Sequence, residues 1–334
     1  MQKAEEIQLQ LRWGKRLQLV LVEYLIWVII VITFLIFSIT IEGYFTIKNL
    51  HFILYVASPL GLLVFAEAFS LLAGNLDLSI SQNTGLTAML VGVLLVDWAA
   101  FLPTWSGILF LFIIGALLGS INGFIVGKIG INPFLVTLAT YLMFNWMTYY
   151  IRKGAITNVP RVITFLGGAK TGGIYNAIIV LFVTTAVLYF VLDHTRFGGY
   201  VRAVGGNPDA ASMLGINIGW VNFWVFTLSG FLSGGAALLY IGYLKSIPST
   251  IAEGDVLFLA FAGAIIGGVS LKGGRGSIIG ALGGVILLGV IEAGTTMTAM
   301  DAALRGVFNG LILLIAILIN AGRAKLRDRI LMPA

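Results

Sequence analysis

Ionisable residues are scarce inside the apolar stretches of this chain, and they are the first candidates for chemistry. Glu67 falls in the middle of one stretch, and Glu292 and Arg305 fall near the ends of two later ones. A charged group at membrane depth is costly and normally faces a cavity or a partner. Glu67 could therefore carry a proton for a secondary transporter, or it could be a neutral or paired packing group. For Glu292 and Arg305 we expect an ion pair between neighbouring helices.

Two polar islands interrupt the apolar sequence. In the first, residues 74–84, a glycine is followed by Asp77 and hydroxyl side chains, which predicts a helix that starts again inside the membrane with Asp77 or Ser79 as its cap. The second opens with Asn-Pro at residues 132–133, and helical spacing aligns its later polar residues on one face. The residues predicted to line a translocation path or to contact a solute are Asp77, Ser79, Asn83, Asn132, Phe134, Thr137, Thr140 and Asn145. Alternatively, the same groups make hydrogen bonds between helices.

Other site chemistries find little support in the sequence. The Gly-rich run at residues 267–276 is no Walker A loop, because Lys272 is neither preceded by GxxxxG nor followed by Ser or Thr. His51 and His194 lie at opposite ends of predicted spans, so we expect no histidine metal site within one chain. The absence of cysteine excludes disulfides and thiolate metal sites. We therefore expect no ATP site and no cofactor of its own, and a transport subunit rather than an enzyme or a channel.

Composition places the whole chain in the membrane. Hydrophobic residues make up 59% of the 334 and charged residues 10%, with a mean hydropathy of +1.02, whereas soluble domains carry about 25% charged residues. We expect one all-α transmembrane domain over residues 1–334, because no stretch is long enough and polar enough for a separate soluble domain. The net charge of +6 is explained by membrane topology rather than by binding to nucleic acid.

The chain contains ten candidate spans. They cover residues 17–41, 50–73, 84–100, 107–127, 134–151, 174–192, 218–241, 256–269, 278–293 and 302–320. The stretches 256–269 and 278–293 are shorter than the usual 17–25 residues, so they are expected to be tilted, broken or re-entrant. The first stretch is too long for a signal-peptide core and is expected to be retained as an anchor.

The distribution of Lys and Arg predicts the orientation. With the N-terminus in the cytoplasm, thirteen of the 20 basic residues fall on the inner side and seven on the outer side. This asymmetry predicts that residues 1–16, 194–217 and 321–334 are all cytoplasmic. An odd number of spans would place the basic residues 321–334 outside, against the preference of Lys and Arg for the cytoplasmic side.

The central polar stretch, residues 196–217, divides the chain into two halves. Within it, Asn207 followed by Pro208 and Asp209 predicts a helix start, and Gly215 predicts its stop, so a helix of about two turns is expected at the membrane surface. Such a helix could dock into another protein, or it could be a plain connector.

Glycines recur every four residues in several apolar stretches. This spacing lets helix backbones approach closely where lipid offers no hydrophobic drive for association. The stripes are Gly115, Gly119, Gly123 and Gly127; Gly276, Gly280 and Gly284; and the pairs Gly230 with Gly234 and Gly263 with Gly267. They predict a tightly packed fold of many helices that can shift against one another, and they hint at an internal repeat of the kind transporters use.

Four segments together resemble the bacterial ABC sugar permeases, the ribose permease group, over about residues 45–320. They are GNLDLSIS, INPFLVTLAT, RFGGYVRAVGGNPDAASMLGIN and AIIGGVSLKGGRGSIIGALGG, in the order and with the separations of that family. The resemblance implies the membrane subunit of an ATP-binding cassette importer, with type II, vitamin B12 importer-like architecture in the inner membrane. It also implies alternating access that carries a monosaccharide.

The same resemblance implies partners. These are an ATPase subunit that holds ATP and Mg²⁺, a periplasmic or lipid-anchored solute-binding protein, and a second permease copy or paralogue. The central helix would couple to the ATPase through Gly206, Asn207, Pro208, Ala210, Ala211, Leu214 and Gly215. The sequence departs from the family signature at Asn75, Leu76 and Ser81, and Ala66-Glu67 is closer to nucleoside permeases. A nucleoside or an autoinducer-2-type solute is therefore the alternative substrate.

Overall fold

A computed structural model describes residues 25–251, 254–298, 300–301, 303–312, 314–315, 318 and 322. The predicted cytoplasmic segments 1–16 and 321–334 lie outside these residues, apart from Gly322. The helices of the described part are α3 (Leu25–Thr40), α4 (Ile47–Leu72), α5 (Ile80–Val93), α6 (Ser106–Phe124), α7 (Pro133–Ile151), α8 (Arg161–Gly168), α9 (Asn176–His194), α10 (Arg196–Gly206), α11 (Pro208–Met213), α12 (Ile218–Leu244), α13 (Val256–Ile266) and α14 (Ile278–Met297).

Short elements complete this order. The π-helical turns η1 (Leu94–Trp98) and η2 (Ile125–Ile129) extend α5 and α6, and the strands β1 (Lys170–Thr171) and β2 (Ile174–Tyr175) form an antiparallel hairpin before α9. The loops that follow α7 and α12 meet in a bridge between Ile156 and Ile247.

Each of the ten predicted stretches overlaps a described helix. Among the described residues, six helical segments are long and apolar enough to cross a membrane, counting α5 with η1 and α6 with η2. The helices α3, α13 and Ala303–Ile312 are apolar but shorter. The prediction that residues 256–269 form a short helix is confirmed, since α13 has 11 residues. The prediction of a short helix at 278–293 was wrong, because α14 continues through Thr295 to Met297 and reaches 20 residues.

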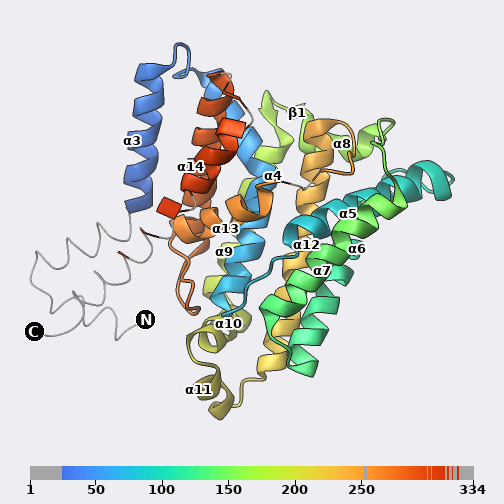
Figure 1. Cartoon of the computed structure of the whole chain (residues 1–334), viewed down its shortest axis with the longest axis vertical. Helices are drawn as coiled ribbons and strands as arrows, with labels where there is room; N and C mark the ends of the chain where they lie inside the picture. The colour runs from blue at the N-terminus through green and yellow to red at the C-terminus, as the bar shows by residue number, and fades with distance from the viewer. Residues whose placement is uncertain are drawn as a thin grey trace, which may run out of the picture.

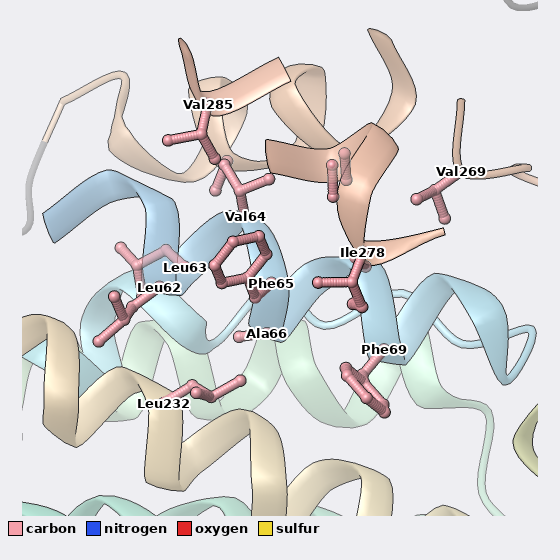
Figure 2. Close-up of a cluster of buried hydrophobic side chains, with 14 of the residues drawn as sticks. Leu62, Leu63, Val64, Phe65, Ala66, Phe69, Leu232, Val269, Ile278 and Val285 are labelled. Atoms are coloured by element: carbon pink, nitrogen blue, oxygen red, sulfur yellow. The ribbon is translucent and has the colours of Figure 1, made fainter. Parts of the chain in front are cut away.

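Helices α4 and α12 form the centre of the bundle (Figure 1). In both, 78% of the most apolar window is buried, against 28% for α6 with η2 and 33% for α9. The main core cluster lies around α4: Figure 2 shows Leu62, Phe65 and Phe69 on this helix, with Leu232 of α12 on one side and Ile278 and Val285 of α14 on the other. Helices α4 and α12, together with α5 and η1, whose window is equally buried, therefore hold the bundle together, and α6 and α9 present apolar side chains outward.

Close glycine contacts join α6 with η2 to α12, as the stripe predicted. A Cβ atom added at Gly115 would lie 2.9 Å from the backbone nitrogen of Gly234, and one added at Gly119 would lie 2.9 Å from that of Gly230. The same contact joins α13 to α14, where a Cβ at Gly267 would lie 2.6 Å from the Cα of Ala281. Backbones this close leave no space for a side chain.

One glycine of the predicted stripes lies elsewhere. Gly276 comes before α14, in the loop, with a φ of +149°. The stripe on α14 therefore begins at Gly280, because Ser277 caps the helix and accepts a hydrogen bond from the Gly280 backbone at 3.0 Å.

Candidate functional site

The central stretch forms two helices at one end of the bundle (Figure 1). The predicted short helix is confirmed as α11: the Asn207 side chain accepts a hydrogen bond from the Ala210 backbone at 3.0 Å, Pro208 takes the first position, and Gly215 has a φ of +80°. A positive φ favours glycine, which explains the stop at this position. The sequence did not predict α10, because its four glycines hid a helix whose buried face includes Val201 and Val204.

Helix α11 has an inner and an outer side. Met213 and Leu214 are 88% and 80% exposed, and Ala210 is exposed as well. Ala211 is 2% exposed and belongs to the main core cluster. Ala211 thus packs against its own bundle in this conformation, and its predicted contact with a partner stays a prediction. Gly206, Asn207, Pro208 and Gly215 are exposed around it.

Backbone contacts between glycines anchor α10 to the rest of the bundle. A Cβ added at Gly205 would lie 2.8 Å from the backbone nitrogen of Gly274, and that nitrogen donates to the Leu72 carbonyl oxygen at 2.9 Å. Gly273 and Gly274 adopt left-handed backbone conformations, with φ of +80° and +70°. We call this meeting of Leu72, Gly205, Gly273 and Gly274 the glycine junction.

The glycine junction gives the Gly-rich run at 267–276 a structural role in packing the loop before α14. It brings the loop before α14 against the end of α4 and the end of α10. Arg202 strengthens the contact, since its guanidinium pairs with Asp193 at 2.5 Å and reaches the Gly276 carbonyl oxygen at 3.5 Å. The surface helix α11 is thereby connected through α10 to α4.

The first polar island continues from the end of α4. Asp77 Oδ1 accepts hydrogen bonds from the Ser79 backbone at 3.0 Å and the Ser79 hydroxyl at 2.7 Å, and Oδ2 accepts from the Ser229 hydroxyl of α12 at 2.7 Å. The Asn122 amide of α6 donates to Ser79 Oγ at 2.8 Å. Ser79 occupies the cap position of α5, but its side chain makes no capping bond. At this helix start it is Asp77 that accepts a backbone hydrogen bond, from the N–H of Ser79.

Further hydrogen bonds extend this island between helices. Asn83 donates to the Gly115 carbonyl oxygen of α6 at 3.2 Å, and Thr84 to the Ser233 carbonyl oxygen of α12 at 3.2 Å. Asp77, Ser79 and Asn83 are at most 2% exposed. In this conformation the predicted path residues of the first island therefore hold α5, α6 and α12 together.

The second polar island lies on α7. Asn132 caps this helix, accepting a hydrogen bond from the Phe134 backbone at 2.9 Å, while Phe134 itself is 45% exposed. Thr137 and Thr140 lie on one buried face, and their hydroxyls donate chiefly to carbonyl oxygens of α7 itself; Thr137 also reaches the Leu76 carbonyl oxygen at 3.2 Å. Asn145 is half-buried, and its Oδ1 has no hydrogen-bond partner among the described residues.

The remaining ionisable residues behave differently from one another. The predicted ion pair is confirmed, with Arg305 Nη1 at 3.4 Å from Glu292 Oε1. Glu67 is completely buried on α4, and neither carboxylate oxygen has a hydrogen-bond partner among the described residues.

The sequence did not predict several hydrogen-bond partners of the first polar island. Asn122 and Ser229 complete the Asp77 cluster, and Asn75 donates to Asn222 of α12 at 2.9 Å. Each is a single polar residue in an apolar helix or at its end. Such residues are a signal for contacts between helices, although the sequence names no partner for them.

The fold and this site define a multi-pass membrane protein with hydrogen-bonded helix contacts at its centre and an exposed short helix at one end. Residues 49–317 match the family described as the permease component of the branched-chain amino acid transport system. The chain belongs to this family.

Curated relatives match most of the chain. It is 30% identical to the fructose import permease protein FrcC of Rhizobium meliloti, over 88% of this chain and 83% of that protein. It is 32% identical to the ribose import permease protein RbsC of Bacillus subtilis, over 78% and 80%, and 26% identical to RbsC of Escherichia coli K12, over 83% and 87%. No solved structure matches the chain.

Proposed function

We propose that this protein is the membrane subunit of an ATP-binding cassette importer and forms the translocation path for a monosaccharide. The family match and the likeness to ribose and fructose import permeases support this class. A relative described as a probable ABC transporter permease protein, YphD of Escherichia coli, is 30% identical over 88% of the chain. ATP and Mg²⁺ would bind to a separate ATPase subunit, so the chain itself is a transport subunit and not an enzyme.

The structural observation that carries the proposal is the surface helix α11 with its backbone anchor. Met213 and Leu214 offer an apolar contact to a partner, and the glycine junction ties α10 to the end of α4. From there, residues 73–79 lead directly to the Asp77 cluster, which contacts α6 and α12. If closure of the ATPase displaced α11, the movement would be transmitted to the Asp77 cluster through backbone contacts. Backbone contacts deform less than contacts between flexible side chains.

The glycine contacts between helices suit such a movement. Backbones at the α6–α12 and α13–α14 contacts lack interlocking side chains, so small shifts cost little. Alternating access would then open the region around Asp77 and α7 to one side of the membrane and afterwards to the other. This arrangement uses two permease copies or a pair of related permeases, in the type II architecture with about ten spans.

Orientation follows from the same helix. The ATPase side is cytoplasmic, so α10, α11 and both termini would lie on the cytoplasmic side of the inner membrane, as the Lys and Arg distribution predicts. A solute-binding protein, free in the periplasm or anchored to lipid, would deliver the solute at the opposite end. Sugar is favoured over the amino acid of the family description because the similar curated proteins import ribose and fructose. Nucleosides and autoinducer-2-type solutes are the alternatives.

Uptake into proteoliposomes tests the proposal. With the ATPase subunit and ATP, ribose or fructose should accumulate, and without the ATPase subunit it should not. Gly205→Ala should abolish most of this uptake because its Cβ would collide with the backbone of Leu72. Gly199→Ala on the same helix has open space and should transport normally. Equal uptake by both variants would contradict coupling through the glycine junction.

A secondary transporter is the second candidate, because Glu67 is a buried carboxylate without a hydrogen-bond partner among the described residues. In that case a proton gradient would drive uptake without any ATPase, and Glu67→Gln would abolish it. Under our proposal Glu67→Gln keeps most of the ATP-driven uptake. Gradient-driven uptake by the chain alone would reject the ATPase-driven mechanism.

A further inference from the structure

A cavity lies at the end of the bundle opposite α11. Its volume is about 340 Å³, within the range of small-ligand sites. Three segments that are distant in sequence form its walls: the start of α4, the β1–β2 hairpin and the end of α14. Figure 1 shows the hairpin at this end of the molecule. None of these segments takes part in the glycine junction or the Asp77 cluster.

The lining of this cavity is cationic. Lys48, His51 and Lys170 face it, and no Asp or Glu is found in its lining within the described part of the chain. Among the described residues neither lysine has a carboxylate within ion-pair distance; Lys170 instead lies 4.3 Å from the ring centre of Tyr175. The first turn of α4 contains no acidic residue, so the positive end of its helix dipole adds to the potential. The site therefore suits an anion.

Its position relative to the bilayer narrows the choice of anion. Helix α4 has 26 residues and is about 39 Å long, whereas the hydrocarbon core is about 30 Å thick, so a terminal turn reaches the headgroup layer. Phe45 and Ile47 are both 73% exposed beside the cavity. Lysines beside exposed apolar side chains at a helix end fit the membrane interface, where the ammonium groups reach the headgroup layer.

We infer that this cavity binds the phosphate group of an anionic phospholipid. Lys48 and Lys170 meet the phosphate as charges from two different segments, and His51 in the same lining offers a further nitrogen for hydrogen bonding. Phe52 and Tyr175 provide apolar walls for the glycerol part of the headgroup. An acidic side chain of a protein partner has the same charge, but it would not need Phe45 and Ile47 exposed beside the site. The inference is independent of the transported solute.

Thermal unfolding of the purified full chain in neutral detergent tests this site. The probes are dihexanoyl phosphatidylglycerol, dihexanoyl phosphatidylcholine and inorganic phosphate at equal concentration. The variant is Lys48→Gln with Lys170→Gln, and the matched control is Lys153→Gln with Arg161→Gln, which removes the same charge from exposed residues outside the cavity. If the double variant is unfolded before any lipid is added, Lys48→Gln and Lys170→Gln are measured separately in its place.

Phosphatidylglycerol should raise the Tm of the wild-type chain and of the control by about 2–4 °C. The cavity variant should lose at least half of this shift, and phosphatidylcholine should shift none of the proteins. An equal shift with inorganic phosphate would overturn the assignment to lipid. An equal shift in the cavity variant, or no shift at all, would overturn the site. Loss of uptake in the cavity variant without any lipid effect would indicate a protein partner instead, and would also overturn it.

Discussion

The two polar islands look alike in sequence and differ in the structure. Around Asp77, some side-chain bonds are local, as between Ser79 and Asp77, and others cross to α6 and α12; Asp77, Ser79 and Asn83 are at most 2% exposed. On α7, Asn132 caps its own helix at the surface, and the Thr140 hydroxyl donates only to carbonyl oxygens one turn away. The first island joins α5, α6 and α12, whereas most bonds of the second lie within α7, apart from the contact of the Thr137 hydroxyl with the Leu76 carbonyl oxygen.

This difference indicates which polar residues the fold depends on. A buried group that loses its partner across a helix contact leaves an unsatisfied donor or acceptor, at a cost of about 1–3 kcal/mol. A threonine hydroxyl bonded within its helix leaves nothing unsatisfied when removed, because the carbonyl oxygen still accepts its backbone hydrogen bond. Substitutions of Asp77 and its hydrogen-bond partners should therefore destabilise the protein more than loss of the Thr140 hydroxyl on α7.

The largest effect is expected for Asp77→Ala. The Ser79 backbone N–H and the Ser79 and Ser229 hydroxyls would lose their acceptor, so the free energy of unfolding should fall by roughly 3 kcal/mol. Thermal unfolding in detergent measures it. Asp209→Ala removes an exposed carboxylate and is the control. A stability like that of the control would show that the cluster does not hold the helices.

A smaller effect is expected for Asn132→Ala. The Phe134 backbone N–H would lose its acceptor at a helix start, which costs about 1 kcal/mol. The same unfolding measurement applies, with the exposed Asn158→Ala as control. If Asn132→Ala destabilised the protein as much as Asp77→Ala, the two islands would not differ in the way described.

The smallest effect is expected for Thr140→Val, within about 0.5 kcal/mol of the wild-type protein. Thr84→Val is its counterpart in the first island, because Thr84 also donates to Ser233 of α12. It should cost about 1 kcal/mol. Equal stabilities for the two variants would remove the distinction between bonds within a helix and bonds between helices.

Sequence patterns anticipated much of this architecture. Each predicted apolar stretch overlaps a described helix, and glycine spacing located the close helix contacts, because both depend on side chains that are near one another in the chain. The cap at Asn207 and the stop at Gly215 were predicted for the same reason. The burial of Ala211 was not predicted, because no local pattern says which side of a six-residue helix packs inward.

The partners of the polar residues were beyond the sequence. Asp77 and Ser229 are separated by 152 positions, and Leu72 and Gly274 by 202, so only the packing of α4, α12 and the loop before α14 brings them together.

By itself, the sequence determined a helical membrane protein with a capped surface helix, because hydropathy, capping and glycine spacing act over a few residues. The tertiary structure alone decided that Asp77 binds helices together and that a Gly-rich loop joins α10 to α4. Contacts between distant segments depend on how whole helices pack, and no short pattern encodes that.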